Sequence, residues 1–382
     1  MSSDAHTPSP GPLSGVRVVE VAGLGPITFA AMLLADMGAD VVRIVRPGHA
    51  EMERGATLRG RRQAAIDLRL QDGRHVLWQL VDVADVLLEG FRPGVMERLE
   101  LGPTQALQRN ARLVYGRMTG WGQSGPRSAM AGHDINYIAV SGALHAIGQD
   151  DPIVPLNLVG DYGAGALYLA MGVIAAVLHA RKAGMGQVVD CAICDGTASL
   201  LSLMHGLRHV GRWNDERHSN TLDGAAPFYR TYRCKDGKAI SVGAIEPQFY
   251  QLLLKQLNLQ GSALFANQND RSRWGEQART LQSHFATRTR DEWAALFGGT
   301  DACVTPVNSL GESAQDPHLR ARGTFLNFHG EIQPAPVPRF SATPSAARAT
   351  TADADPNDIL RDWRAPQDLS ATSRALDSVA NH

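Results

Sequence analysis

The sequence predicts an α/β fold: a large doubly wound, Rossmann-like domain built on a parallel sheet, plus a small α/β domain. Up to residue 208, short apolar runs typical of buried strands alternate with helical segments, as in a parallel sheet covered on both faces. A polar, irregular stretch then interrupts this alternation, and a hairpin pattern follows. The length of 382 residues also exceeds what one simple core usually holds.

The elements of the large domain follow in order. GVRVVEVAG ends at a glycine turn and predicts a strand over 15–23, and a helix over 26–38 begins with Pro26 and ends with Gly38. Further strands are expected over 39–45, 63–70, 85–90, 112–120 and 187–191, with helices over 72–84 and 195–207.

The second domain begins after the irregular stretch. TYRCKDGKAISVGAI predicts a hairpin that turns at Lys235-Asp236-Gly237, and helices are expected near 247–256 and 290–297. The tail from Gln333 is rich in Pro and Ala and is expected to pack back on the large domain. The predicted divisions are a disordered lead-in (1–10), a large domain (11–208), a linker (209–224), a small domain (225–325) and a return segment (326–382).

Bulk properties exclude several classes of function. With 37 Lys and Arg against 38 Asp and Glu, the net charge is −1, which argues against a nucleic-acid binder. Four cysteines and the lack of a signal-peptide pattern favour a reducing, cytoplasmic location. The apolar stretch from Asp161 to about Leu178 is short for a membrane span, so we expect a buried helix and no span.

Two motifs suggest other functions. Gly-Leu-Gly follows the first strand, as in a dinucleotide-binding turn, but Thr28 replaces the third glycine. The second strand carries Arg43 and Arg46 rather than a ribose-binding acid, so an NADP-dependent oxidoreductase stays open. Cys191 and Cys194 form a CxxC, either a redox pair or half a metal site; its place between a strand and a helix favours two small core residues.

A run of arginines lies before and within the third predicted strand. Guanidinium groups there would bind phosphates bidentately, although a solvated basic loop is slightly favoured on sequence alone. The run comprises Arg54, Arg59, Arg61, Arg62 and Arg69.

Two ionisable residues stand at apparent helix starts. Asp161 directly precedes the long apolar helix, where capping is the common role, yet Gly163 and Gly165 would let a ligand oxygen reach the exposed N–H groups. His133 follows Gly132 and could exchange a proton near neutral pH; His145 competes with it. Facing each other across a carbon acid, an imidazole and a carboxylate would form a two-base system.

Several motifs together resemble the α-methylacyl-CoA racemase family, within the family III CoA-transferase superfamily. The resemblance spans about residues 12–345. It rests on GHDINY (132–137), PLNLVGDYGAG (155–165), GQVVD (186–190), DGTA (195–198), DGAAPFY (223–229), VGAIEPQFY (242–250) and GTDACVTPV (299–307), with LLEGFRPGVMERL (87–99) in support.

The resemblance implies an interlocked homodimer that epimerises 2-methylacyl-CoA thioesters at C2, through an enolate and with no metal or organic cofactor. His133 and Asp161 would be the bases. Glu246, from the partner chain, would support His133, and Asn157 and Tyr229 would line the acyl site. The alternatives are a CoA-transferase that uses Asp161 as a nucleophile and a CoA-binding module without activity.

The resemblance also implies a path for coenzyme A, which is part of the substrate. Arg43 would meet the adenosine phosphates, and a turn at 132–137 would hold the pantetheine-thioester end. The implied contacts are Ile66, Asp67, Leu68, Arg69, Gly90, Phe91, Arg92 and Arg98 at the nucleotide, and Gly132, Asp134, Ile135, Asn136 and Tyr137 at the thioester.

Overall fold

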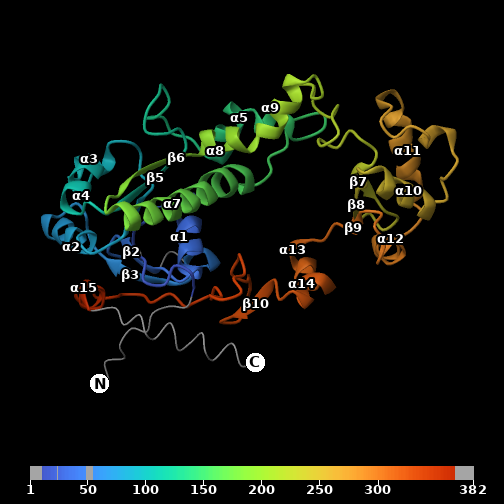
Figure 1. The fold of residues 1–382 in the computed structure, drawn as a ribbon. Coiled ribbons are helices and arrows are strands. Elements are labelled where there is room, and N and C mark those ends of the chain that lie inside the picture. Colours follow the sequence, from blue (N-terminus) through green and yellow to red (C-terminus); the bar gives the residue numbers. More distant parts are fainter. Residues whose placement is uncertain (1–10, 24, 49–54, 366–382) are drawn as a thin grey trace. The chain divides into compact units, whose positions relative to one another are not determined.

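A computed structural model describes residues 11–23, 25–48 and 55–365 (Figure 1). The described chain forms two compact units. Unit 1 holds residues 11–141, 156–200 and 325–365, and unit 2 holds residues 142–155 and 201–324. Unit 2 therefore contains the predicted linker and nearly all of the predicted small domain, together with a short excursion before the apolar helix.

Unit 1 is built on a six-stranded sheet in the order β3-β2-β1-β4-β5-β6. Every neighbouring pair in it is parallel, which confirms the predicted doubly wound α/β class, since this order is that of dinucleotide-binding folds. The strands are β1 (Arg17–Val21), β2 (Asp40–Val45), β3 (Arg61–Ala65), β4 (Val86–Glu89), β5 (Val114–Thr119) and β6 (Gln187–Ala192).

Helices cover both faces of this sheet. One face packs against α1 (Pro26–Asp36) and α7 (Leu167–Ala183). The other packs against α2 (Gln71–Val81), with side chains of α3, α4 and α15. The remaining elements of unit 1 are η2 (Ala56–Leu58), α3 (Val95–Arg98), α4 (Pro103–Arg109), α5 (Asp134–Val140), η3 (Leu158–Ala166), α8 (Ile193–Leu200), β10 (Phe325–Phe328), β11 (Glu331–Pro334) and α15 (Pro356–Arg364).

Two predicted elements have different bounds. The strand expected over 63–70 begins at Arg61 and ends at Ala65, because the carboxylate of Asp67 accepts the backbone N–H of Arg69 and turns the chain. The helix expected over 195–207 is two helices, α8 and α9 (Ser202–His209), separated at Leu201.

Three arginines of the predicted basic run form ion pairs with carboxylates. Arg59 binds Asp36 through two hydrogen bonds of 2.9 and 2.6 Å, and Arg62 binds Asp40. Arg61 binds Glu20, which also pairs with Arg43. Both expectations for these three residues, a phosphate loop and a solvated basic loop, are therefore wrong; Arg54 lies outside the described residues.

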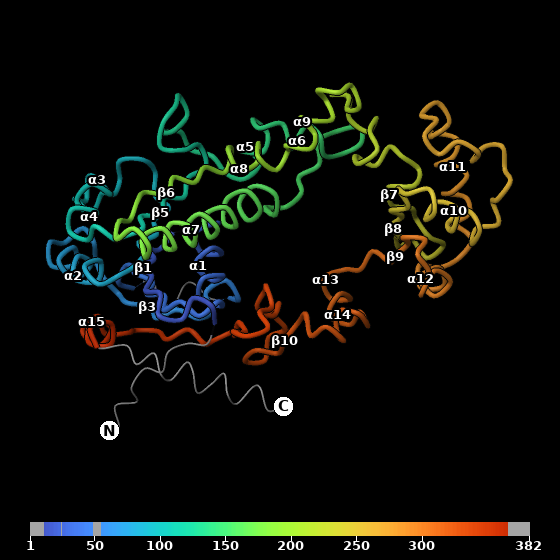
Figure 2. Tube along the Cα trace, in the orientation of Figure 1, coloured from blue at the N-terminus to red at the C-terminus, as the bar shows by residue number. Residues whose placement is uncertain are grey.

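The described part of the return segment, from Thr351 to α15, lies along the β3 edge of the sheet (Figure 2). Thr351 exchanges backbone hydrogen bonds with Arg61 and Gln63, and Arg62 binds Asp362 at 2.8 Å. The indole of Trp363 donates to Asp40. An exposed sheet edge invites pairing with other chains, and this segment covers it.

Unit 2 contains an antiparallel sheet in the order β7-β8-β9 and its own aromatic core. The predicted hairpin is present, with Gly237 at a positive φ of 76° in its turn. Its elements are α6 (Ala143–Ala146), α9, β7 (Tyr229–Arg233), β8 (Ala239–Gly243), α10 (Pro247–Gln256), η4 (Ala263–Phe265), η5 (Arg271–Arg273), α11 (Trp274–Phe285), α12 (Arg290–Phe297), β9 (Val304–Pro306), α13 (Leu310–Ser313) and α14 (Pro317–Ala321).

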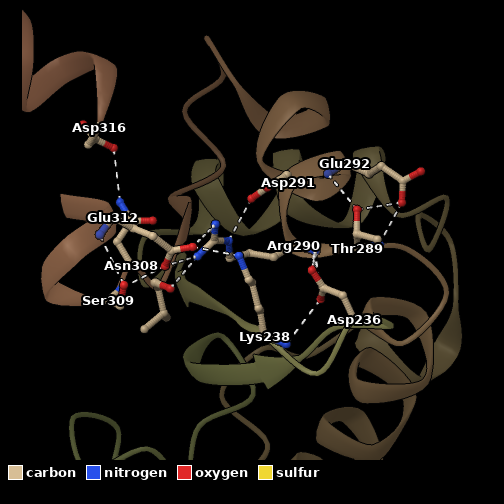
Figure 3. A network of polar contacts seen from close by, with 11 residues as sticks. Asp236, Lys238, Thr289, Arg290, Asp291, Glu292, Asn308, Ser309, Glu312 and Asp316 are labelled. Atoms are coloured by element: carbon tan, nitrogen blue, oxygen red, sulfur yellow. Dashed lines mark hydrogen bonds and ion pairs between the residues drawn. The ribbon is translucent and has the colours of Figure 1, made fainter. Parts of the chain in front are cut away.

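An ion-pair network joins α12, α13 and the hairpin of unit 2 (Figure 3). Arg290 binds Glu312 through two hydrogen bonds of 2.9 and 3.1 Å and also binds Asp291. Lys238 binds the same glutamate at 2.7 Å. Hydrogen bonds from Arg290 and then Lys238 hold the pKa of Glu312 well below its ordinary value. The network fixes one end of the small sheet.

The apolar stretch expected as a buried helix forms a continuous helix over Leu158–Ala183. By length and composition it could cross a membrane, with a mean hydropathy of 1.7 in its most apolar window, half of which is buried. Leu169, Val173 and Val177 pack in the core of unit 1. The opposite face exposes Leu167, Met171 and Leu178.

We predict that Glu20→Gln lowers the free energy of unfolding by about 3–5 kcal/mol, because it removes the negative charge between two buried guanidinium groups. Glu20, Arg43 and Arg61 are all almost fully buried. The measurement is urea unfolding followed by circular dichroism. Glu100→Gln, at an exposed carboxylate, is the matched control, and an equal, small loss in both variants would contradict the prediction.

Candidate active site

A cavity of about 470 Å³ lies within unit 1, where the carboxyl ends of its parallel strands meet. Its walls include Gly25 and Pro26 after β1, Gly90 to Pro93 after β4, and Gly120 and Trp121 after β5. The sheet order reverses between β1 and β4, and open α/β sheets bind ligands at such a point. The strand order thus places the cavity.

His133 enters this cavity from the start of α5. It is the residue that precedes the first helical turn, in extended conformation. Its backbone N–H donates to the side-chain oxygen of Asn136 at 3.0 Å, which fixes the backbone at the helix start. The residue is exposed in unit 1 and therefore accessible to a ligand.

Asp161 enters from the first turn of the long helix, which begins at Leu158 as a π-helical segment. The expectation that Asp161 directly precedes the helix as its cap is wrong, since Asn157 holds the capping position. A π-helical turn is rare and occurs often at functional sites. Gly163 and Gly165 lie within this segment, and the aspartate stays near the unpaired N–H groups of the helix start.

A buried carboxylate connects the two residues. Asp134 accepts the backbone N–H of Asp161 at 2.6 Å. Burial, and then the charge of Asp134, raise the pKa of Asp161 above its ordinary value. A hydrogen bond from Asn157 and the nearby His133 partly offset this. A carboxyl with a raised pKa in a cavity is suited to taking up and returning a proton.

Aromatic rings form one wall of the cavity. Trp121 and Tyr137 meet edge to face with their centroids 4.7 Å apart, and a side chain at Gly120 or Gly132 would overlap the Tyr137 ring. Burial raises the pKa of Tyr137, and the Asp161 charge adds to the effect. These glycines therefore allow the ring to lie against the strand end.

The loop after β4 is held by a buried ion pair. Glu89 accepts the backbone N–H of Phe91 and binds Arg117, both at 2.8 Å. Burial raises the pKa of Glu89, and both contacts act against it. Arg117 also binds Glu97 on α3. This arrangement fixes Gly90, Phe91 and Arg92 at the cavity wall.

The structure brings eight of the nineteen predicted site residues to one cavity. The members that line the cavity are His133, Asp161, Gly90, Phe91, Arg92, Gly132, Asp134 and Tyr137. Ile135 and Asn136 are exposed on α5 outside the lining, and Arg98 is exposed at the end of α3. Asn157 is outside the lining and forms a hydrogen bond with Asp161; its contact with the acyl group stays a prediction. The turn after β3 holds Ile66, Asp67, Leu68 and Arg69, where Asp67 and Arg69 form an exposed ion pair.

Arg43 is fully buried. Its guanidinium binds Glu20 and the carbonyl of Gly23 in the body of the sheet. Its proposed contact with phosphates stays a prediction, and the pairing with Glu20 gives this arginine a structural role.

Two predicted residues lie in unit 2. Glu246 is exposed directly before α10, and Tyr229 lines a separate cavity of about 700 Å³ beside β7 and β8. Their action beside His133 stays a prediction. The competing His145 is also in unit 2, where its ring nitrogen lies 2.7 Å from the carbonyl oxygen of Asp215.

The other motifs have structural explanations. A Cβ built on Gly25 would lie 3.3 Å from the Asp161 carboxylate, so this carboxylate occupies the approach to α1 that a pyrophosphate would need. Cys191 is buried and Cys194 half-buried, and all four cysteines are free. Among the described residues, no group of three or more His, Cys, Asp or Glu side chains is placed to hold a metal ion.

Several lining residues were missed from the sequence. They include Gly25, Pro26, Met118, Trp121, Ser128 and Met130. A signal existed for Gly25, Pro26 and Trp121, because each closely follows a predicted strand. Ser128 and Met130 lie in an irregular loop with no such signal.

Comparisons with known proteins identify the family of this chain. Residues 13–358 match the CoA-transferase family III. The alpha-methylacyl-CoA racemase of Mus musculus is 45% identical over 358 residues, covering 92% of this chain and 93% of the relative. That of Homo sapiens is 45% identical over 336 residues, 87% of each chain. A CAIB/BAIF family protein from Brucella suis has a TM-score of 0.78 at 24% identity, covering 93% of this chain and 100% of that one.

The chain therefore belongs to the family III CoA-transferases, and the family expected from the motifs is confirmed. The match includes both described units.

We predict that Asp161→Asn raises the free energy of unfolding at neutral pH by about 0.5–2 kcal/mol, as active-site substitutions often do. A carboxyl whose pKa is raised on folding destabilises the protein above its unfolded pKa and is neutral in both states below it. The gain should therefore vanish in acid. Urea unfolding of wild type and variant, at neutral pH and at a pH below the unfolded pKa of the carboxyl, measures this gain. A loss of stability at neutral pH would contradict the raised pKa of Asp161.

Proposed function

We propose that this protein is a racemase that interconverts the R and S forms of 2-methylacyl-CoA thioesters by two-base proton transfer. The single observation that carries the proposal is that His133 and Asp161, from two different helix starts, line one cavity at the switch point of the sheet. The racemases at 45% identity support the same substrate class.

The geometry suits removal of a proton from carbon. One residue takes the C2 proton, the electron pair moves to the thioester carbonyl as an enolate, and the other residue delivers a proton to the opposite face. Backbone N–H groups at the two helix starts, other than those of His133 and Asp161 that already have partners, would stabilise the enolate oxygen. The raised pKa of Asp161 keeps its conjugate acid available for the return step.

Coenzyme A would approach along the loop after β4. Arg92 is exposed at the cavity wall and Arg98 is exposed on the adjoining α3, so both can meet phosphates. Arg69 is also exposed, in the turn after β3, where it pairs with Asp67. We propose these three, ahead of the buried Arg43, as the principal phosphate contacts.

We also propose that the active unit is a homodimer, interlocked as the sequence resemblance implies, in which the partner chain supplies Glu246 and Tyr229. The exposed apolar face of α7, with Leu167, Met171 and Leu178, supports a second copy as the covering surface. The proposed reaction needs no metal or organic cofactor, because coenzyme A is part of the substrate. A cytoplasmic location is also part of the proposal.

We predict that the protein, incubated with either epimer of a 2-methylacyl-CoA in deuterated water, incorporates deuterium at C2. His133→Ala should reduce exchange from one epimer far more than from the other, because each base serves one face. Mass spectrometry of separated epimers measures both. Equal, mild losses would contradict the two-base assignment.

The same assay separates the transferase alternative. A transferase would require an added carboxylate acceptor, and hydroxylamine would trap its Asp161 anhydride. Trapping without exchange would replace the racemase proposal.

We predict a solution mass of twice the chain mass of 41.1 kDa by light scattering. Met171→Glu should lower it toward the monomer, since a charge on a buried apolar interface is costly, whereas His179→Glu on the same helix, at an already polar exposed position, should not. A monomeric wild type would contradict the dimer.

A further inference from the structure

Asp134 occupies a position that the reaction does not account for. It is the first residue of α5, directly after His133. Its Oδ2 accepts the backbone N–H of Asp161 at 2.6 Å. One side-chain hydrogen bond therefore connects the two segments that carry the proposed bases.

This carboxylate is costly for the fold. Asp134 is only 8% exposed, and its second oxygen, Oδ1, is buried without a hydrogen-bond partner within the described chain. A buried polar atom of this kind usually finds a partner. Its position at the start of α5 compensates only in part, through the helix dipole.

The neighbouring sequence keeps room for the contact. A Cβ on Gly160 would overlap the carboxylate of Asp134 and lie 2.9 Å from a methyl group of Ile138. The φ angle of Gly160 is not positive. The close approach of Asp134, rather than the backbone conformation, therefore explains why a glycine stands here. A side chain at this position would force the Asp134 carboxylate and the Ile138 side chain to shift.

We propose that Asp134 is a positioning residue, whose carboxylate holds the backbone of Asp161 at a fixed distance from His133 across the cavity. It does not itself touch the reacting carbon. The inference rests on the proposed racemase function and goes further, because it assigns Asp134 to the spacing of the bases rather than to the pantetheine contact that the family resemblance implies.

The charge of Asp134 has a second effect. It disfavours the ionised form of Asp161, after burial, and so raises its pKa. The other titratable or charged groups that face Asp161 or its neighbour Tyr137 are His133, directly before α5, Tyr137 on α5, Arg92 in the loop after β4, and Cys194 on α8. None of these named groups is a carboxylate, whereas Asp134 is. Its contribution to the pKa of Asp161 can therefore be measured by replacing it with a neutral residue.

Asp134→Asn separates charge from spacing. The amide oxygen can still accept the Asp161 N–H, while the negative charge is gone. We predict that the carboxyl of Asp161 then titrates at lower pH than in the wild type, as followed by NMR of protein labelled with carbon-13 at aspartate carboxyls. Asp161→Asn assigns the resonance. Asp190→Asn is the matched control, because Asp190 also accepts a backbone N–H but lies outside the cavity. An unchanged titration in Asp134→Asn would overturn the electrostatic part.

Asp134→Ala tests the spacing. In this variant the kcat of C2 exchange should fall roughly 100-fold, the size expected for a displacement of about 1 Å, with KM little changed. The Asp134→Asn variant should keep most of the wild-type kcat when it is measured at its own pH optimum. Equal kcat values for Asp134→Ala and wild type, or a loss confined to KM, would overturn the positioning role. A wild type without C2 exchange would refute the racemase proposal itself, and the carboxyl titration would still decide whether Asp134 acts on Asp161.

Discussion

The reversal of strand order between β1 and β4 is the constraint on which the site depends. The chain winds outward from β1 in one direction through β2 and β3, and in the other through β4, β5 and β6. The loops after β1 and β4 therefore separate, and no crossover helix fills the space between their ends. Two later helix starts, those of α5 and of the π-helical segment, close this space and bring His133 and Asp161 to it.

Buried charge is the second feature of unit 1. Glu20 joins Arg43 and Arg61, Asp36 joins Arg59, and Glu89 joins Arg117. Buried pairs add little net stability, yet losing one partner is expensive. Their value here is geometric, since Glu89 fixes the loop after β4 and Arg59 binds the carbonyl of Pro334 on the return segment. Arg59 and Arg61, from the arginine run that the sequence offered for phosphate binding, thus serve the scaffold.

The sequence predicted the alternation of strands and helices, the hairpin, and the meeting of His133 and Asp161 at one site, because hydrophobic period, glycine turns and motif order are local signals. It missed features that depend on tertiary contacts. Arg61 begins a buried strand although it is charged, because it pairs with Glu20. Glu20 is 41 residues away in the chain, so no local pattern predicts this pairing. The π-helical start at Leu158 and the contact of Asp134 with Asp161 link segments with no common local pattern. Ser128 and Met130 reach the cavity from a loop whose path the sequence does not encode locally.

The most direct test of the central claim is a crystal structure with a bound 2-methylacyl-CoA. The account predicts that C2 of the acyl group lies between the imidazole of His133 and the carboxylate of Asp161, on opposite faces of the carbon. An acyl group whose carbonyl carbon, rather than C2, faces Asp161, with His133 out of reach, would contradict it and indicate acyl transfer instead.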